Sequence, residues 1–127
     1  MASEQARGCR AVGSARYSED GLFTPGKIAG ELGTTSEEVA RAAGLGGHFI
    51  QRKDRLSSDT TQRRLREMVE IIDKAEPRFG SALVAYAWYR SQPLQGFSGW
   101  TAMQLVRSGR AGDVRELIDS IDAGVHA

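Results

Sequence analysis

The stretch DTTQRRLREMVEIIDKA, residues 59–75, decides the fold class. Its apolar residues follow one another at spacings of three, one and three: Leu65, Met68, Val69 and Ile72. This spacing places them on one face of a helix, which we expect to end at Pro77. The helix should join an N-terminal and a C-terminal helical part. Its apolar stripe should be buried, in the core or across the two-fold axis of a homodimer.

Two short helices are expected before this stretch, followed by a third short segment at residues 48–53. Pro25 suits a first helical turn, and Gly33 suits a helix end. Thr35 and Glu38 have the spacing of a capping box at the start of a second helix. A small residue at Ala29, a turn glycine at Gly33 and an apolar residue six positions later are typical of a helix-turn-helix.

Three more helices are expected after it. Residues 79–90 form the most apolar one; because it is apolar on two sides, it should be central in the core or partly covered by a partner. Residues 92–99 contain proline and glycine and are typical of a loop. Thr101 caps the next helix. The last helix should end at Gly124 and leave a free tail. The pattern contains no convincing strand, so it predicts an all-α protein of about seven helices.

The length of 127 residues suits one domain or two very small ones sharing a core. We expect three segments: a tail without apolar periodicity (residues 1–21), a helix-turn-helix part (residues 22–56) and a C-terminal helical domain (residues 57–127). Hydrophobic residues make up 40% and charged residues 26%, a globular composition. No apolar stretch is long enough for a membrane span or a signal peptide, so the expected location is the cytoplasm.

Residue types that carry catalysis or hold metals do not converge in this sequence. Cys9 is the only cysteine, and neither His48 nor His126 has another ligand at metal-binding spacing. There is no phosphate-binding glycine loop and no nucleophile elbow. We therefore expect no enzyme activity, no cofactor and no metal.

Basic residues are concentrated in the middle of the chain. Residues 51–66 carry six basic and two acidic side chains, although the net charge of the whole chain is only +1. Such a segment predicts contact with phosphates, or else a solvated helix face. The candidate DNA-binding residues are Gln51, Arg52, Lys53, Arg55, Arg63 and Arg64. Glu37 and Glu38, where base-reading side chains usually lie, argue against deep insertion into the major groove.

The C-terminal half contains an ordered series of landmarks. They are RLREM at 64–68, PRFG at 77–80, AWYR at 87–90, PL at 93–94, Gly99, TA at 101–102, LV at 105–106, Gly109, Val114, Ile118 and GVHA at 124–127. This series resembles the toxin-binding domain of the Xre/MbcA/ParS-type antitoxins. The helix-turn-helix before it is similar to the Xre-like part of the same family, so the resemblance spans residues 22–127. The chain departs from the family at Tyr89, where leucine is common, and at Ala102, where proline is usual.

The resemblance implies a type II antitoxin. Its partner would be a RES-domain toxin that degrades NAD, neutralised when the antitoxin covers the active-site cleft. It also implies a homodimer within a larger complex that binds operator DNA and represses its own operon. The candidate toxin-binding residues are Trp88, Phe97, Trp100, Asp119, Asp122, Gly124, Val125, His126 and Ala127. We expect the small C-terminal residues to enter the NAD pocket and the two aspartates to pair with toxin arginines.

Two other functions are compatible with the residues. The first is a stand-alone helix-turn-helix regulator whose C-terminal domain only dimerises, and the second is an interaction scaffold with no DNA role. A neighbouring RES-type reading frame would favour the antitoxin. Salt-dependent binding of the operon's own promoter would separate the antitoxin and the regulator from the scaffold.

Overall fold

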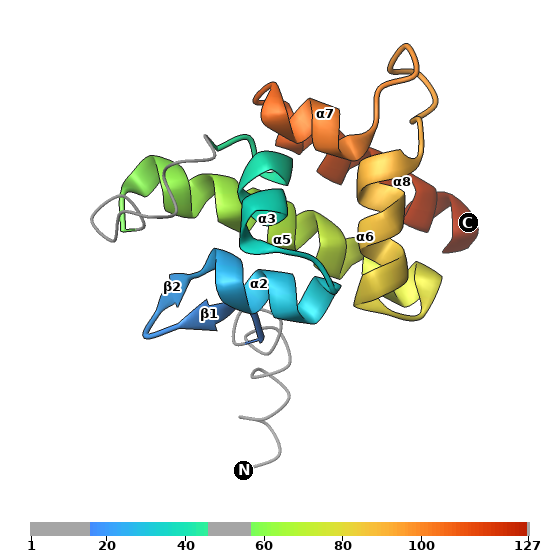
Figure 1. The fold of residues 1–127 in the computed structure, drawn as a ribbon. Helices are drawn as coiled ribbons and strands as arrows, with labels where there is room; N and C mark the ends of the chain where they lie inside the picture. The colour runs from blue at the N-terminus through green and yellow to red at the C-terminus, as the bar shows by residue number, and fades with distance from the viewer. Residues whose placement is uncertain (1–15, 46–56, 127) are drawn as a thin grey trace.

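The computed structural model describes residues 16–45 and 57–126, with side chains as far as residue 123. The third short segment, predicted at residues 48–53, lies outside these ranges. Six helices and one small hairpin lie in these ranges (Figure 1). The elements in order are β1 (Ser18–Glu19), β2 (Leu22–Phe23), α2 (Pro25–Leu32), α3 (Ser36–Ala42), α5 (Asp59–Phe79), α6 (Ala82–Ser91), α7 (Ala102–Arg107) and α8 (Ala111–His126). The prediction of a predominantly helical protein is confirmed, and the hairpin corrects the expectation that it is all-α.

The hairpin brings the chain into the core at residues 16–23, most of which lie in the segment predicted to be a tail. β1 and β2 pair antiparallel, with Ser18 opposite Phe23. Asp20 and Gly21, the two turn residues between them, both have positive φ, at 55° and 81°. This is the backbone of a type I′ turn, for which Asp-Gly is a preferred pair. Tyr17 is fully buried, so residues 16–21 belong to the folded unit and not to a tail.

Helix α5 forms the axis of the molecule. Its four predicted stripe residues are all buried, as expected. The helix does not end at Pro77: it continues to Phe79, and Gly80 closes it with φ 87°. A proline in the last turn removes a single backbone hydrogen bond, so the helix can continue past it. The helix α6 consequently begins at Ala82, later than predicted, with Ser81 as its N-cap.

The short helices are capped as the sequence predicts. Thr35 accepts a hydrogen bond from the Glu38 amide at the start of α3, and Gly33 closes α2 in the left-handed conformation, with φ 70°. Thr101 and Gln104 form a reciprocal capping box on α7. The helix α8 continues through Gly124 to His126, so the predicted stop at Gly124 is wrong.

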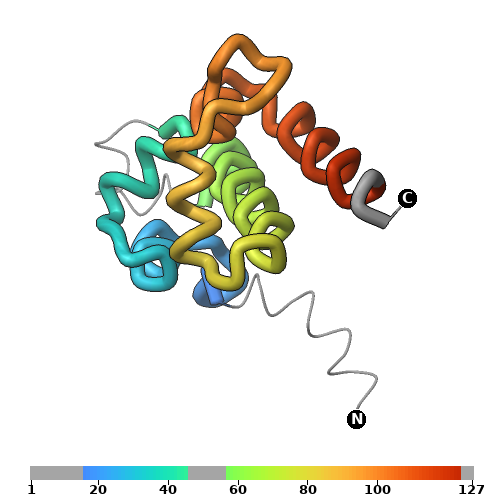
Figure 2. Tube along the Cα trace, turned by 90° about the vertical axis from the view of Figure 1, so that its right-hand side faces the viewer, coloured from blue at the N-terminus to red at the C-terminus, as the bar shows by residue number. Residues whose placement is uncertain are grey.

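One hydrophobic core holds all these elements together. It includes residues from the predicted helix-turn-helix part, such as Ile28 and Val39, together with Leu105 and Val114 from the C-terminal half. The Tyr89 hydroxyl on α6 donates to the Ala42 carbonyl oxygen, at 2.8 Å. The two predicted parts therefore pack as one unit. Figure 2 shows that the last turns of α8 extend away from it.

Candidate protein-binding site

The loop between α6 and α7 is closed by its own backbone. The Leu94 amide donates to the Trp100 carbonyl oxygen at 2.8 Å, and the Trp100 amide donates to the Phe97 carbonyl oxygen at 3.0 Å. Pro93 and Thr101 form an isolated β-bridge at the base of the loop. Leu94 is buried and anchors the loop to the core. The loop therefore presents its aromatic side chains in a fixed arrangement.

Two aromatic residues of this loop, both predicted as toxin contacts, differ in their exposure. Trp100 is 40% exposed and is one of the few large apolar side chains on the described surface. Phe97 is half-buried and packs against the edge of the core. Aromatic residues on a fixed loop lose little conformational entropy on binding, which makes them suitable interface anchors.

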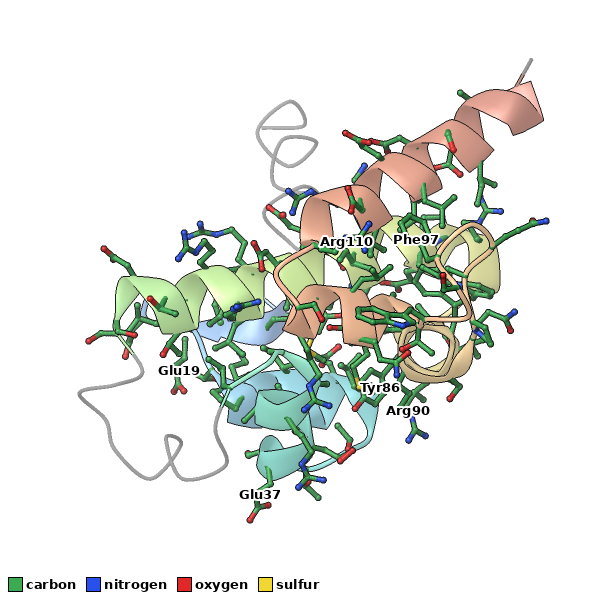
Figure 3. All side chains as sticks on the ribbon, turned by 90° about the horizontal axis from the view of Figure 1, so that it is seen from above. Glu19, Glu37, Tyr86, Arg90, Phe97 and Arg110 are labelled. Carbon is green, nitrogen blue, oxygen red and sulfur yellow. The ribbon has the colours of Figure 1, made fainter. Side chains whose placement is uncertain are left out.

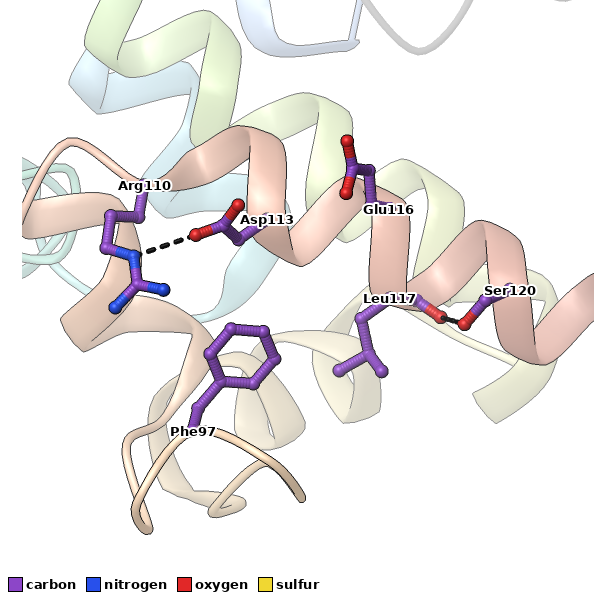
Figure 4. A pocket seen from close by; sticks show the side chains of 6 residues that line it. All are labelled: Phe97, Arg110, Asp113, Glu116, Leu117 and Ser120. Carbon is purple, nitrogen blue, oxygen red and sulfur yellow. Dashed lines mark hydrogen bonds and ion pairs between the residues drawn. The ribbon is translucent and has the colours of Figure 1, made fainter.

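Phe97 forms one wall of a groove against α8. The groove has a volume of about 360 Å³ and is open to solvent; it is lined by Phe97, Arg110, Asp113, Glu116, Leu117 and Ser120. The side chains of Phe97 and Leu117 lie on opposite sides of it (Figure 4). The Arg110 guanidinium carbon lies 5.6 Å from the centre of the Phe97 ring. Its Nε donates to Asp113 Oδ2 at 2.7 Å, so Arg110 is held in place from both sides.

The groove residues of α8 share one helix face. Asp113, Glu116, Leu117 and Ser120 are three or four positions apart, which is the spacing of neighbours on a helix surface. The sequence analysis did not select any of them, nor Arg110. Their periodicity is visible in the sequence, but it is indistinguishable from that of a solvated helix face until the loop is seen to pack beside it.

Asp119 and Asp122 lie on a different face of α8 and already have partners. Lys74 Nζ lies 2.7 Å from Asp119 Oδ1, and Arg78 Nη1 lies 2.7 Å from Asp122 Oδ1. Both cations come from α5. A third pair, between Glu70 and Arg115, joins the same two helices at 3.2 Å. These aspartates are partly exposed, but α5 neutralises their charge.

The remaining predicted toxin contacts have other surroundings. Trp88 is half-buried on α6, and its ring centre lies 5.8 Å from that of Phe79. It therefore packs against the core, while keeping some exposed surface. Gly124, Val125 and His126 continue the backbone of α8, and Ala127 lies outside the described residues. The end of α8 carries Ile121, which is 39% exposed.

The structure describes two of the six candidate DNA-binding residues. Arg63 is exposed on α5. Arg64 donates from Nη1 to the Val106 carbonyl oxygen at 2.7 Å, so it ties α5 to the end of α7. Gln51, Arg52, Lys53 and Arg55 lie outside the described residues. Gln62, next to Arg63 on α5, is buried and exchanges two hydrogen bonds with the backbone of Phe23.

A second apolar surface lies on α6. Leu83 is 56% exposed and Val84 is 48% exposed, in agreement with a helix that is apolar on two sides. On the opposite side of the molecule from Phe97 and Arg110, α3 presents Glu37 to solvent (Figure 3). These two places are separate from the groove and serve below as sites for control substitutions.

Comparison of the chain with protein-family models, with curated proteins and with solved structures finds no match. Among the described residues, no group of three or more histidine, cysteine or acidic side chains is arranged to hold a metal ion. None of the described helices combines the length and the apolar character that crossing a membrane requires.

Proposed function

We propose that this protein is an antitoxin that binds a RES-domain toxin and neutralises it by covering the active-site cleft. The family part of the proposal comes from the landmarks quoted above. The structural observation that supports it is the preformed loop with exposed Trp100, beside a groove and next to a helix whose end extends from the body. A fixed aromatic anchor beside a cleft is a common arrangement at protein interfaces.

The packing of α8 changes which of its residues carry the proposal. Asp119 and Asp122 are paired with Lys74 and Arg78, so toxin arginines would have to displace these cations. The last turn of α8 is helical as far as His126, so the element that enters the toxin is the end of a helix and not a free tail. Trp100 and the groove would provide the remaining contact area.

A truncation tests the neutralisation. Removing residues 123–127 shortens only the end of α8 beyond the core residue Ile118, so the fold should be retained. We expect the truncated chain to bind the RES-domain protein encoded beside it but to leave most of its NAD turnover active. The substitution Trp100→Ser should instead weaken the complex itself, by about tenfold or more.

The matched control is Leu83→Ser, which removes an exposed apolar side chain from a different side of α6 than Trp88. It should leave both binding and inhibition unchanged. Full inhibition of NAD turnover by the truncated chain at equal occupancy would move the occlusion to loop 92–101. If the genome holds no RES-type reading frame next to this one, the antitoxin proposal fails at its first step.

Operator binding is a second part of the proposal. The α2–α3 corner, with Gly33 in the left-handed conformation, supports it because it fits a helix-turn-helix. Arg63 is the described candidate that is free to contact a phosphate. Substitution Arg63→Gln should weaken binding to the operon's promoter on all sequences and reduce the salt slope by about one. An unchanged slope would favour the interaction scaffold.

A further inference from the structure

The groove between Phe97 and α8 has apolar side chains on two sides and one uncompensated negative charge. Phe97 and Leu117 face each other across it, and neither is covered completely. The charged side chains that line it are Arg110, Asp113 and Glu116. Arg110 is already engaged by Asp113 and by the Phe97 ring. One negative charge therefore remains on the groove.

That remaining charge belongs to Glu116. Of the four carboxylates on the described part of α8, three form ion pairs: Asp113 with Arg110, Asp119 with Lys74 and Asp122 with Arg78. Glu116 is exposed, and the described residues give it no ion-pair partner. It lies one residue before Leu117, and in Figure 4 its carboxylate points away from the Phe97 and Leu117 side chains, so only a long basic side chain would reach it from the groove.

We propose that this groove is the docking site for a partner segment that carries an apolar side chain next to a lysine or arginine. The apolar side chain enters between Phe97 and Leu117, and its basic neighbour pairs with Glu116. The argument rests on charge complementarity, because the groove has one uncompensated carboxylate and no uncompensated cation. An acidic segment would be repelled by the Glu116 carboxylate.

The site is prepared for such a segment before binding. Backbone hydrogen bonds to Leu94 and Trp100 fix the backbone of Phe97, and the Arg110 guanidinium lies over one face of the Phe97 ring. Little ordering is then needed when the partner arrives, so a short contact can contribute measurably. The identity of the partner as a toxin rests on the proposed function. The apolar and basic character of the segment rests only on the residues that line the groove.

Titration of the full chain with capped hexapeptides tests the groove directly. One peptide carries a leucine followed by a lysine in a glycine–serine background; a second has glutamate in place of the lysine, and a third has glycine in place of the leucine. Amide chemical shifts of the labelled protein report where each peptide binds. We expect the leucine–lysine peptide alone to shift the amides around Phe97 and residues 113–120, at millimolar concentration.

Substitutions locate the two contacts. Glu116→Gln should weaken the leucine–lysine peptide by about two- to fivefold and remove the preference over the glutamate peptide. Leu117→Ser should weaken it by about tenfold. The controls are Glu37→Gln, an exposed glutamate on the opposite side of the molecule, and Leu83→Ser, an exposed leucine on α6; neither should change the titration.

Three results would overturn the proposal: equal binding of the lysine and glutamate peptides, no shifts at the groove with any peptide, or shifts centred on Leu83 and Val84. These results are independent of the antitoxin function. If the Glu116→Gln protein neutralises the toxin as well as the wild type does and no peptide binds, the groove proposal fails and the antitoxin proposal stands. If the leucine–lysine peptide binds but no toxin does, the antitoxin proposal fails and the groove proposal stands.

Discussion

Tyr17 shows how much the first described residues contribute to the fold. Its side chain is fully buried, yet its hydroxyl has no hydrogen-bond partner among the described residues. Burial raises the pKa of this phenol from its ordinary value of 10 to about 12. Beside it, Arg16 bonds to Glu76 at 2.7 Å and to Asp73 at 3.1 Å, which fixes the start of the hairpin against α5.

Substitution Tyr17→Phe should separate the contribution of the ring from that of the hydroxyl. At pH 7 we expect the free energy of unfolding to stay equal or to rise by about 1 kcal/mol, because an unpaired buried hydroxyl is removed. In the wild type the phenol ionises near pH 10 when unfolded and near pH 12 when folded. The free energy of unfolding of the wild type is therefore unaffected by this group below pH 10 and falls as the pH rises from 10 toward 12. The Phe variant should lose less stability over that interval.

The matched control is Tyr89→Phe, because the Tyr89 hydroxyl does have a partner, the Ala42 carbonyl oxygen. It should cost about 1 to 2 kcal/mol at pH 7, in urea denaturation. If Tyr17→Phe costs as much, then the Tyr17 hydroxyl is hydrogen-bonded in solution and its burial is satisfied.

Local signals at the residue scale were predictable, and long-range ones were not. Thr35, Gly33 and Thr101 cap helices through contacts within a few residues, so their roles follow from short patterns. The Asp20–Gly21 turn carries an equally local signal, which is at odds with the tail expected at residues 1–21. The burial of Tyr17 in the shared core depends on elements far along the chain, as does the pairing of its neighbour Arg16 with Glu76 on α5, and no local pattern encodes either.

At the scale of whole elements, α5 and α8 are joined by a ladder of three ion pairs: Glu70–Arg115, Lys74–Asp119 and Arg78–Asp122. The spacings along both helices are three or four residues, so the pairs lie along one seam. Beyond Ile118, α8 has no further buried residue among those described, and the ladder holds its exposed turns to α5.

Charge reversal tests whether this seam stabilises α8. Lys74→Glu places a carboxylate against Asp119 and should lower the free energy of unfolding by about 0.5 to 1 kcal/mol at low salt. Adding Asp119→Lys restores an attractive pair and should recover most of the loss. Hydrogen exchange of the α8 amides measures the local effect, which 1 M salt should largely remove. Identical exchange in all three proteins would mean that apolar packing alone holds α8.

The stripe of α5 was predictable because amphipathic periodicity over many residues is the strongest helix signal. The ends of the helices were less predictable. Pro77 indicated a stop two residues before the real one, and Gly124 indicated a stop that does not occur. A glycine weakens a helix by about 1 kcal/mol and a proline by about 3 kcal/mol, and the packing of the surrounding turns can offset both costs.

At the scale of the whole molecule, the two predicted parts share one core. Beyond the Tyr89–Ala42 bond, the Gln62 side chain on α5 exchanges hydrogen bonds of 2.8 and 3.0 Å with the Phe23 backbone in the hairpin. The boundary near residue 57 therefore divides the sequence but not the packing.

We expect a fragment of residues 57–127 to lack a cooperative thermal transition. Without the N-terminal half, the faces of α5 and α6 that pack against the hairpin, α2 and α3 would be exposed to water. A chain of residues 16–127 should melt cooperatively near the temperature of the full protein. Circular dichroism compares the two. A sigmoidal transition in the shorter fragment would show that the C-terminal part is an independent domain.

The candidate site was predictable in part. Phe97 and Trp100 stand next to glycines at a segment with the composition of a loop; Trp100 is exposed, and Phe97 is half-buried. Arg110, Asp113 and Glu116 become a site only because the loop packs beside α8, a contact that periodicity does not reveal. Asp119 and Asp122 were chosen for their charge, and their partners on α5 lie more than forty residues away in the sequence.

The order of signs along the α5–α8 seam limits how α8 can move. In the first pair the acid, Glu70, is on α5; in the other two the acid is on α8. Sliding α8 by one helical turn, about 5.4 Å, would bring Arg115 toward Lys74 in one direction and Asp119 toward Glu70 in the other. Each displaced register also keeps one attractive pair, Asp119 with Arg78 or Asp122 with Lys74, against the three attractive pairs of the native register. A partner that slides α8 along the seam would therefore exchange three attractive pairs for one attractive and one repulsive pair, so the charges favour the native register.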